Sequence, residues 1–234
     1  MVGGWFVVLL GDRLAQQKPK VVSLPQHPTV RVCWPRITGI GRSILAFDAQ
    51  SQGCRGRRGV SLLNIETSRL LLRPFTPDDA AAAAPFLRDP DVIRFMGATP
   101  LSIDEVAETI RGHQERYYER LGMGALAGVL KSTGALVGRY ALLRAEIEGV
   151  EELEIDYLTS AAYRRHGYAK EAVRGILAAA WAEGKCRVVA RIRPDNTPSL
   201  RVAQGVGFRF EKDVQRDGIR MELYVAAPGR MTAG

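Results

Sequence analysis

Residues 164–169 read Arg-Arg-His-Gly-Tyr-Ala and lie between an expected strand and an expected helix over residues 168–183. A helix starting here would present unpaired backbone N–H groups and the positive end of its dipole to the preceding segment. Gly167 can adopt a positive φ and allows a ligand to approach the backbone. Such a site suits an anion, so the segment is a candidate phosphate-binding loop. The six residues alone also fit an ordinary basic turn.

Acidic residues alternate along a second segment, the expected strand 150–158, and fall on one of its faces: Glu152, Glu154 and Asp156. Apolar residues occupy the other face. We expect this strand to be central, because helix-forming segments flank it on both sides, and central strands rarely bury acids. At least one carboxylate should therefore line a polar cleft. An edge strand with a solvated acidic face is the alternative.

A third polar cluster, Asn196-Thr-Pro-Ser199, follows thirty residues after the loop and precedes a short expected helix. Ser199 lies near the start of that helix, where its hydroxyl could cap the helix or donate a proton into a cleft. Asn196 also fits an ordinary turn. Neither residue identifies a chemistry by itself.

The remaining pattern alternates helices and strands. Strands are expected near residues 69–73, 125–131, 135–144 and 186–193, and a terminal hairpin near 208–225. Helices are expected near 77–87, 91–97 and 102–121, and between Thr197 and Val206. The prediction is an α/β protein with a mixed sheet and helices on both faces.

Taken in order, these motifs resemble the GNAT family of acetyl-CoA-dependent N-acetyltransferases. The loop resembles the family pattern Gln/Arg-x-x-Gly-x-Gly/Ala through Arg164, Gly167 and Ala169. Residues 66–75, Glu-Thr-Ser-Arg-Leu-Leu-Leu-Arg-Pro-Phe, and the Asn-x-x-Ser spacing are most similar to the RimJ/RimL branch. The resemblance covers roughly residues 64–226 and implies the GNAT fold, whose central mixed sheet is splayed at the cofactor site.

The resemblance also implies the cofactor, acetyl-CoA, and the residues around it. The pyrophosphate would lie on Arg165, His166, Gly167, Tyr168 and Ala169, and Arg164 opens this cofactor-binding motif. Main-chain groups of Leu158 and Thr159 would meet the pantetheine, and the Asn196 side chain would meet the cofactor.

The implied reaction is direct attack of a primary amine, either a protein N-terminus or a small-molecule amine, on the acetyl thioester. Glu154 is the candidate base and Ser199 the candidate residue near the sulfur. Many family members place a Tyr four residues after this serine, where this chain has Ala203, and Asp156 replaces a glycine common in the branch. A GNAT-like module that binds acyl-CoA without turnover is therefore the alternative.

Charge distribution bears on partners. The net charge of +8 is concentrated in residues 1–63, which hold nine Lys and Arg against two Asp, so the remainder is nearly neutral. Nucleic acid is therefore not an expected partner of the folded part. Three scattered cysteines indicate neither a metal site nor a disulfide framework and suit a cytoplasmic location. The apolar run at residues 5–10 is too short for a membrane span.

Three regions follow from these patterns. Residues 1–63 are predicted to be a poorly structured basic extension, 64–226 the acetyltransferase domain and 227–234 a tail. One hypothesis is that the extension is not native coding sequence and that the natural start lies near Val60. The oligomeric state, monomer or homodimer, stays open.

Overall fold

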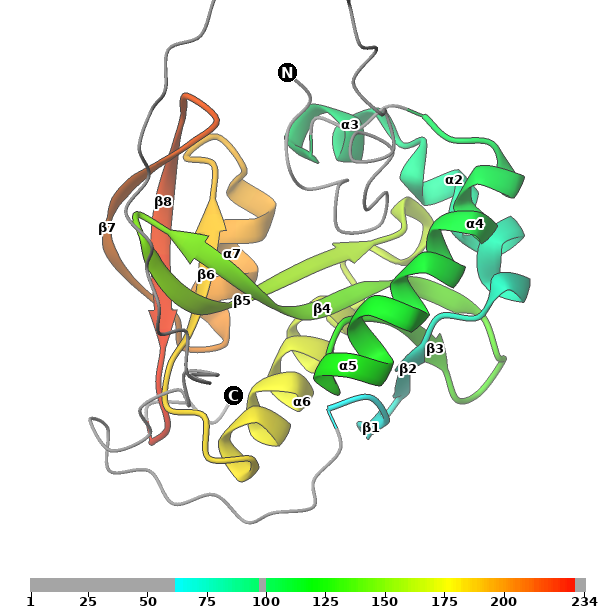
Figure 1. Cartoon of the computed structure of the whole chain (residues 1–234), viewed down its shortest axis with the longest axis horizontal. Coiled ribbons are helices and arrows are strands. Elements are labelled where there is room, and N and C mark those ends of the chain that lie inside the picture. Colours follow the sequence, from blue (N-terminus) through cyan, green and yellow to red (C-terminus); the bar gives the residue numbers. More distant parts are fainter. Residues whose placement is uncertain (1–61, 97–99, 230–234) are drawn as a thin grey trace, which may run out of the picture. The chain divides into compact units, whose positions relative to one another are not determined.

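A computed structural model describes residues 62–96 and 100–229 of the chain. Its centre is an eight-stranded mixed sheet (Figure 1). Across the sheet the strands follow the order β1 (Ile65–Glu66), β2 (Leu70–Pro74), β3 (Ala125–Leu130), β4 (Leu136–Ile147), β5 (Val150–Thr159), β6 (Val188–Ile192), β8 (Ile219–Ala226) and β7 (Arg209–Arg216). The predicted fold class, a mixed sheet with helices on both faces, is confirmed.

One strand pair differs from all the other neighbouring pairs in this sheet. β5 and β6 are parallel and pair at a single position, Glu154 with Val189, whereas the other neighbours are antiparallel. Both strands continue beyond that position, β5 to Thr159 and β6 to Ile192. The sheet is therefore splayed at the carboxyl ends of its two central strands.

Six α-helices are present in the described ranges: α2 (Ala80–Leu87), α3 (Pro90–Met96), α4 (Ile103–His113), α5 (Glu119–Leu121), α6 (Tyr168–Ala182) and α7 (Thr197–Gly205). Short 3-10 turns, η2 (Pro77–Asp79) and η4 (Ala161–Tyr163), precede α2 and the candidate loop. α6 packs against β4 and β5 and contacts α7, while α2 and α4 lie on the opposite side of the sheet (Figure 1).

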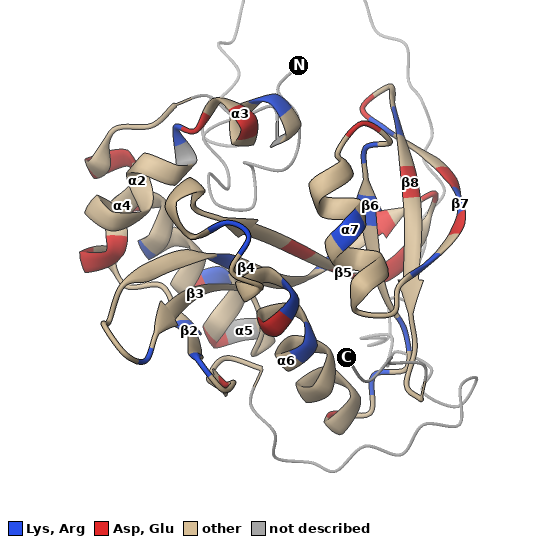
Figure 2. Ribbon diagram, turned by 180° about the vertical axis from the view of Figure 1, so that it is seen from behind, with Lys and Arg blue, Asp and Glu red and all other residues tan. Residues whose placement is uncertain are grey.

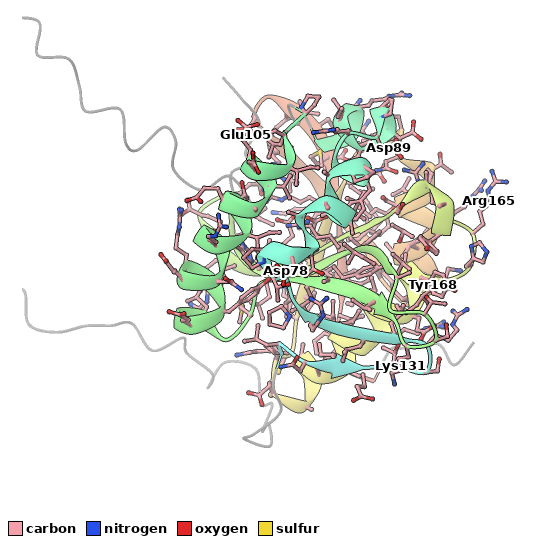
Figure 3. The ribbon with its side chains drawn as sticks, turned by 90° about the vertical axis from the view of Figure 1, so that its right-hand side faces the viewer. Asp78, Asp89, Glu105, Lys131, Arg165 and Tyr168 are labelled. Carbon is pink, nitrogen blue, oxygen red and sulfur yellow. The ribbon has the colours of Figure 1, made fainter. Side chains whose placement is uncertain are left out.

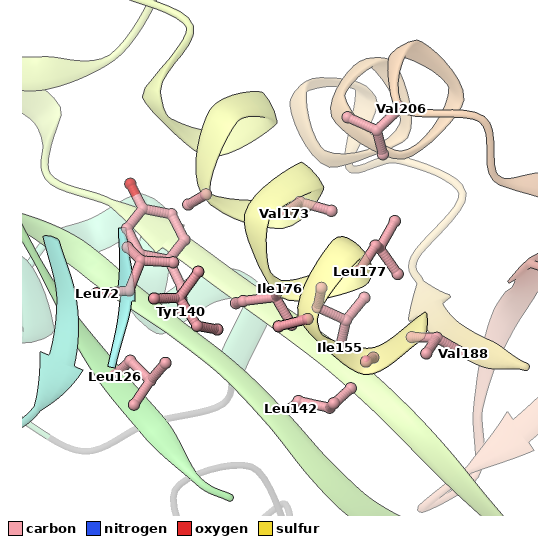
Figure 4. Packing of buried hydrophobic residues seen from close by; sticks show 14 of the residues in the cluster. Leu72, Leu126, Tyr140, Leu142, Ile155, Val173, Ile176, Leu177, Val188 and Val206 are labelled. Carbon is pink, nitrogen blue, oxygen red and sulfur yellow. The ribbon is translucent and has the colours of Figure 1, made fainter. Parts of the chain in front are cut away.

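The main core lies between α6 and the sheet. Val173, Ile176 and Leu177 of α6 pack among Leu142 and Ile155 of the central strands (Figure 4). All five side chains are buried. Since burial of such a side chain contributes about 2 kcal/mol, this layer fixes where α6 begins and hence where the candidate loop lies.

The helix predicted over residues 102–121 is interrupted. It opens as expected with a capping box formed by Ser102 and Glu105, and α4 ends at His113. A π-helical turn, η3 (Gln114–Tyr118), follows before α5. The wider turn carries the buried Tyr118, whose hydroxyl accepts a hydrogen bond from Phe75 N (3.1 Å) and donates one to Ala125 O. These partners are distant in sequence, so helical periodicity alone could not indicate the change.

The predicted extension lies outside the described residues except for Leu62 and Leu63. Its boundary and the hypothetical start near Val60 therefore stay predictions. Within the described ranges, none of the helices has the length and apolar character needed to cross a bilayer. The same part of the chain holds no group of three His, Cys, Asp or Glu arranged to bind a metal.

Candidate functional site

The candidate loop has the backbone form that anion binding requires. Arg165 and Gly167 are both left-handed, with φ of 66° and 83°, and α6 begins directly afterwards at Tyr168. Gly167 occupies the N-cap position and has no side chain to satisfy the N–H groups of the first turn. The Arg165 side chain projects away from the protein (Figure 3). A phosphate ahead of α6 would thus meet free N–H groups and the helix dipole.

Arg69, at the start of β2, fixes this loop from outside. Its Nη1 donates to the His166 carbonyl at 3.0 Å, and its Nε donates to Glu171 at 2.6 Å. The guanidinium also lies 4.6 Å from the centroid of the Tyr168 ring. Sequence reasoning placed Arg69 only in a strand and missed this role, because the contacts join residues about a hundred positions apart.

Glu171 collects the other half of the same network. Its Oε1 accepts hydrogen bonds from Thr67 Oγ1 (2.6 Å), Ser68 Oγ (3.0 Å) and Arg69 N (2.7 Å). Burial raises the pKa of this carboxyl, but the hydrogen bonds from Thr67, Arg69 and Ser68 outweigh it and lower the pKa to about 2. The first turn of α6 is therefore tied to the chain just before β2.

We expect Glu171→Gln to destabilise the protein at neutral pH, because the amide cannot replace the charge-assisted hydrogen bonds. A carboxyl whose folded pKa is about 2, against an ordinary 4.5, stabilises the fold above pH 4.5 and loses this contribution as the pH falls toward 2. The gap in Tm between the two proteins should be widest near pH 7 and narrow below pH 4.5. A gap that does not change with pH would contradict this assignment.

Arg164 does not direct its side chain at the expected phosphate position. Its Nη2 donates to Asp89 at 2.6 Å, its Nη1 to Asp91 at 3.0 Å, and its Nε to the Thr159 carbonyl at 3.3 Å. The side chain ties the loop to the start of α3 and to the end of β5. Arg164 thus holds the first position of the loop in place through its side chain. Its predicted part in cofactor binding stays a prediction.

Positive charge nevertheless adjoins the loop on its other side. A surface cavity beside Gly167 is lined in part by Arg69, Lys170 and Arg174. Arg69 directly precedes β2, and the other two side chains come from α6. The carboxylates of Glu66 and Glu171 line the same cavity. The residues present fit a pyrophosphate-bearing cofactor.

The splay between β5 and β6 brings the remaining predicted cofactor residues together. β5 pairs with β6 at Glu154, and Leu158 and Thr159 follow at the end of β5, where it has no further pairing with β6. Asn196, rather than the Ser199 hydroxyl, caps α7: its Oδ1 accepts a hydrogen bond from Ser199 N at 3.2 Å. Tyr157 Oη donates to the Ser199 carbonyl at 2.8 Å, which ties the start of α7 to β5. The loop, the open strand end and Ser199 therefore border one region.

The acidic face of β5 is paired with arginines, and two of its three carboxylates, Glu154 and Asp156, are buried. β5 lies between β4 and β6, so the alternative of an edge strand is wrong. Each carboxylate meets one guanidinium of a neighbouring strand or the residue before it: Glu152 with Arg187, Glu154 with Arg191 and Asp156 with Arg139. Figure 2 shows the acidic positions of β5 beside the basic positions of β6. Arg187 and Arg191 are four residues apart, so they fall on one face of the expected strand 186–193. This spacing was the signal in the sequence for the pairs with Glu152 and Glu154.

Glu154, the predicted base, is 6% exposed. Arg191 holds both of its oxygens, with Nε donating at 2.9 Å and Nη2 at 2.7 Å. Each oxygen of the predicted base therefore already accepts one hydrogen bond from a cation, which stabilises the deprotonated form. Its catalytic role stays a prediction.

The site thus consists of a helix N-terminus without a side-chain cap, suited to an anion, beside the open ends of two parallel central strands. The family model described as an acetyltransferase (GNAT) domain matches residues 69–209. The chain belongs to the GNAT acetyltransferase family, as its sequence motifs predicted. The acetyl donor is accordingly acetyl-CoA.

Individual relatives agree with this placement. The uncharacterized N-acetyltransferase YnaD of Bacillus subtilis is 25% identical over 150 residues, which cover 64% of this chain and 84% of YnaD. A GNAT-family acetyltransferase of Bacillus anthracis is similar in structure, with a TM-score of 0.59 and 24% identity over 70% of this chain and 98% of that one. RimJ of Mycobacterium smegmatis, solved with CoA-disulfide, has a TM-score of 0.57 and 20% sequence identity to this chain. The match covers 73% of this chain and 90% of RimJ. RimJ is thus among the proteins that share this fold.

Proposed function

We propose that the protein transfers the acetyl group of acetyl-CoA to a primary amine, either a protein N-terminus or a small-molecule amine. Family membership supports the acetyl transfer, and the class of acceptor is the proposed part. The observation that carries the proposal is the opening between β5 and β6 next to the Arg69-supported loop. We assign the activity to residues 64–226, preceded by the extension 1–63 and followed by the tail 227–234.

In this proposal the loop backbone from Arg165 to Ala169 binds the pyrophosphate at the positive end of the α6 dipole. Main-chain groups of Leu158 and Thr159 hold the pantetheine arm in the splay. RimJ of Mycobacterium smegmatis, which has the same fold, was solved with a CoA derivative, and this supports the placement. The Asn196 side chain would contact the cofactor through its amide nitrogen, since its oxygen caps α7.

The amine attacks the thioester carbon directly. Its nitrogen forms the new C–N bond, the C–S bond breaks, and the sulfur leaves with the electron pair. A carboxylate of β5 receives the ammonium proton, with Glu154 the residue that the family resemblance implies. Ser199, at the start of α7, would donate a hydrogen bond to the departing thiolate. Alignment of amine and thioester in the splay supplies the larger part of the rate increase.

The binding-module alternative has its own observations: both oxygens of Glu154 are engaged, and Ala203 stands where many relatives have a Tyr. The two functions differ in thiol release. We expect free CoA thiol to appear when the protein is incubated with acetyl-CoA and a panel of N-terminal peptides, polyamines and amino sugars. Mass spectrometry should find one acetyl group on the accepted amine. Tight acetyl-CoA binding without thiol release across the panel would favour the binding module.

A further inference from the structure

The two buried carboxylates near the opening differ in how completely they are bonded. Glu154 has both oxygens on Arg191. Asp156 gives only Oδ2 to Arg139, and its Oδ1 makes no hydrogen bond to any other described residue. Asp156 is 9% exposed, and Ala141, directly across on β4, has no polar side-chain atom to compete for this oxygen. Asp156 therefore has one oxygen without a hydrogen bond from the described residues, whereas each Glu154 oxygen already accepts one from Arg191.

Position along β5 also separates them. Glu154 lies at the single position where β5 and β6 pair, whereas Asp156 lies beyond it, where the strands have separated. Both share the face of Leu158, the residue proposed to meet the pantetheine. Because two strand residues advance the chain by about 7 Å, Asp156 is about 7 Å from the level of Leu158 and Glu154 about twice as far. An aspartate in the opening is closer to the expected thioester.

The partner of Asp156 adds a third observation. The Arg139 side chain is fully buried, yet its Nε and Nη2 have no hydrogen-bond partner in the part of the chain that the structure describes. Buried donors are seldom left unpaired in a site with a purely structural purpose. Arg139 lies opposite Leu158 across β4 and β5. The Arg139–Asp156 pair thus lies at the open end of the splay, and the Nε and Nη2 donors of Arg139 make no hydrogen bonds to the described residues.

We infer that Asp156 is the carboxylate that receives the amine of the acceptor, and that Arg139 positions it. This rests on the proposed function. Asp156 Oδ1 takes one proton from the ammonium, and the neutral nitrogen bonds to the thioester carbon. As the C–S bond breaks, a second amine proton passes to the sulfur, giving the CoA thiol, and the third stays on the amide nitrogen. Asp156 then releases its proton to solvent, so charge and protons balance.

Three single variants test the inference: Asp156→Asn, Glu154→Gln and, as a matched control on the same strand face, Glu152→Gln. With an amine that the wild type acetylates, Asp156→Asn should lower kcat by about 100-fold or more, the usual effect of losing a general base. Its acetyl-CoA affinity, measured by calorimetry, should stay within about threefold of the wild type. Glu152→Gln should keep kcat within about threefold. The loss in Asp156→Asn must exceed that in Glu154→Gln at least tenfold, and any smaller ratio overturns the inference.

Loss of the buried ion pair could by itself lower activity, so Arg139→Gln is the second comparison. It breaks the same pair but keeps the carboxylate, and kcat should fall by about tenfold at most, with Arg139→Lys restoring part of the loss. Equal losses in Arg139→Gln and Asp156→Asn would mean a structural role and overturn the inference. If Asp156→Asn does not fold, the double variant with Arg139→Gln removes both charges and should fold yet stay inactive. Absence of turnover in the wild type would instead overturn the proposed function itself.

Discussion

Replacing Gly167 with Asp is expected to weaken acetyl-CoA binding by at least about 100-fold. Gly167 has a φ of 83°, where a side chain costs roughly 1–2 kcal/mol. The new carboxylate would lie beside the proposed pyrophosphate site and near Arg69, whose Nη2 is 3.5 Å from an added Cβ. Two like charges about 4 Å apart near a protein surface repel by roughly 4 kcal/mol. Repulsion is the larger effect, and each 1.4 kcal/mol is about tenfold in affinity. Calorimetric titration with acetyl-CoA measures the loss.

Two control variants separate strain from charge. Gly167→Ala introduces the strained side chain without the charge and should weaken binding by about tenfold. Gly149 has a φ of 79° in the turn between β4 and β5, with open space around it, so Gly149→Asp repeats both changes away from the loop. Its acetyl-CoA affinity should match the wild type. If Gly167→Asp also kept wild-type affinity, the loop would not be the pyrophosphate site.

The loop could be predicted because its physical basis is local. A glycine before a helix, with basic neighbours, is visible in six consecutive residues, and α6 begins where that pattern placed it. The side-chain contacts that hold the loop were not visible. Arg69 meets His166, and Arg164 meets Asp89, across 97 and 75 positions of sequence. These partners come together only when the segments beside β2 and α3 have folded against the loop. The family motif therefore predicted the loop but not the contacts of Arg69 and Asp89 that hold it.

The acidic strand shows the same limit in another form. Period-2 alternation correctly put three carboxylates on one face of a central strand. Their state depends on the register of β4 and β6 against β5, which alternation does not give. The register brings Arg139 to Asp156 and Arg191 to Glu154, so the two buried carboxylates are each paired with a guanidinium. The position of a carboxylate on the strand therefore does not indicate which one acts in catalysis; the hydrogen bonds of each carboxylate must also be known.

Replacing Arg191 with Met is expected to destabilise the fold by about 3 kcal/mol, since it leaves a buried carboxylate without its partner. The two side chains of the Arg191–Glu154 pair are 9% and 7% exposed. Arg216 lies near enough to interact electrostatically with Glu154, and burial lowers the pKa of Arg216 to about 10. It stays charged at neutral pH and partly compensates Glu154, which places the cost at the lower end of the 3–5 kcal/mol that broken buried pairs usually show.

The double variant Arg191→Met with Glu154→Leu removes both charges and should recover most of this loss, because paired buried charges are often replaceable by apolar side chains of similar size. Urea denaturation of the wild type, both single variants and the double variant closes the cycle. A coupling energy of about 2 kcal/mol or more is expected, and additive effects would show that the pair is not tightly coupled. The cycle measures stability alone, so it is read together with the turnover of Glu154→Gln. If Glu154 serves mainly the stability of the fold, the coupling energy is large and Glu154→Gln keeps its turnover. Strong coupling with lost turnover would return the proton-accepting role to Glu154.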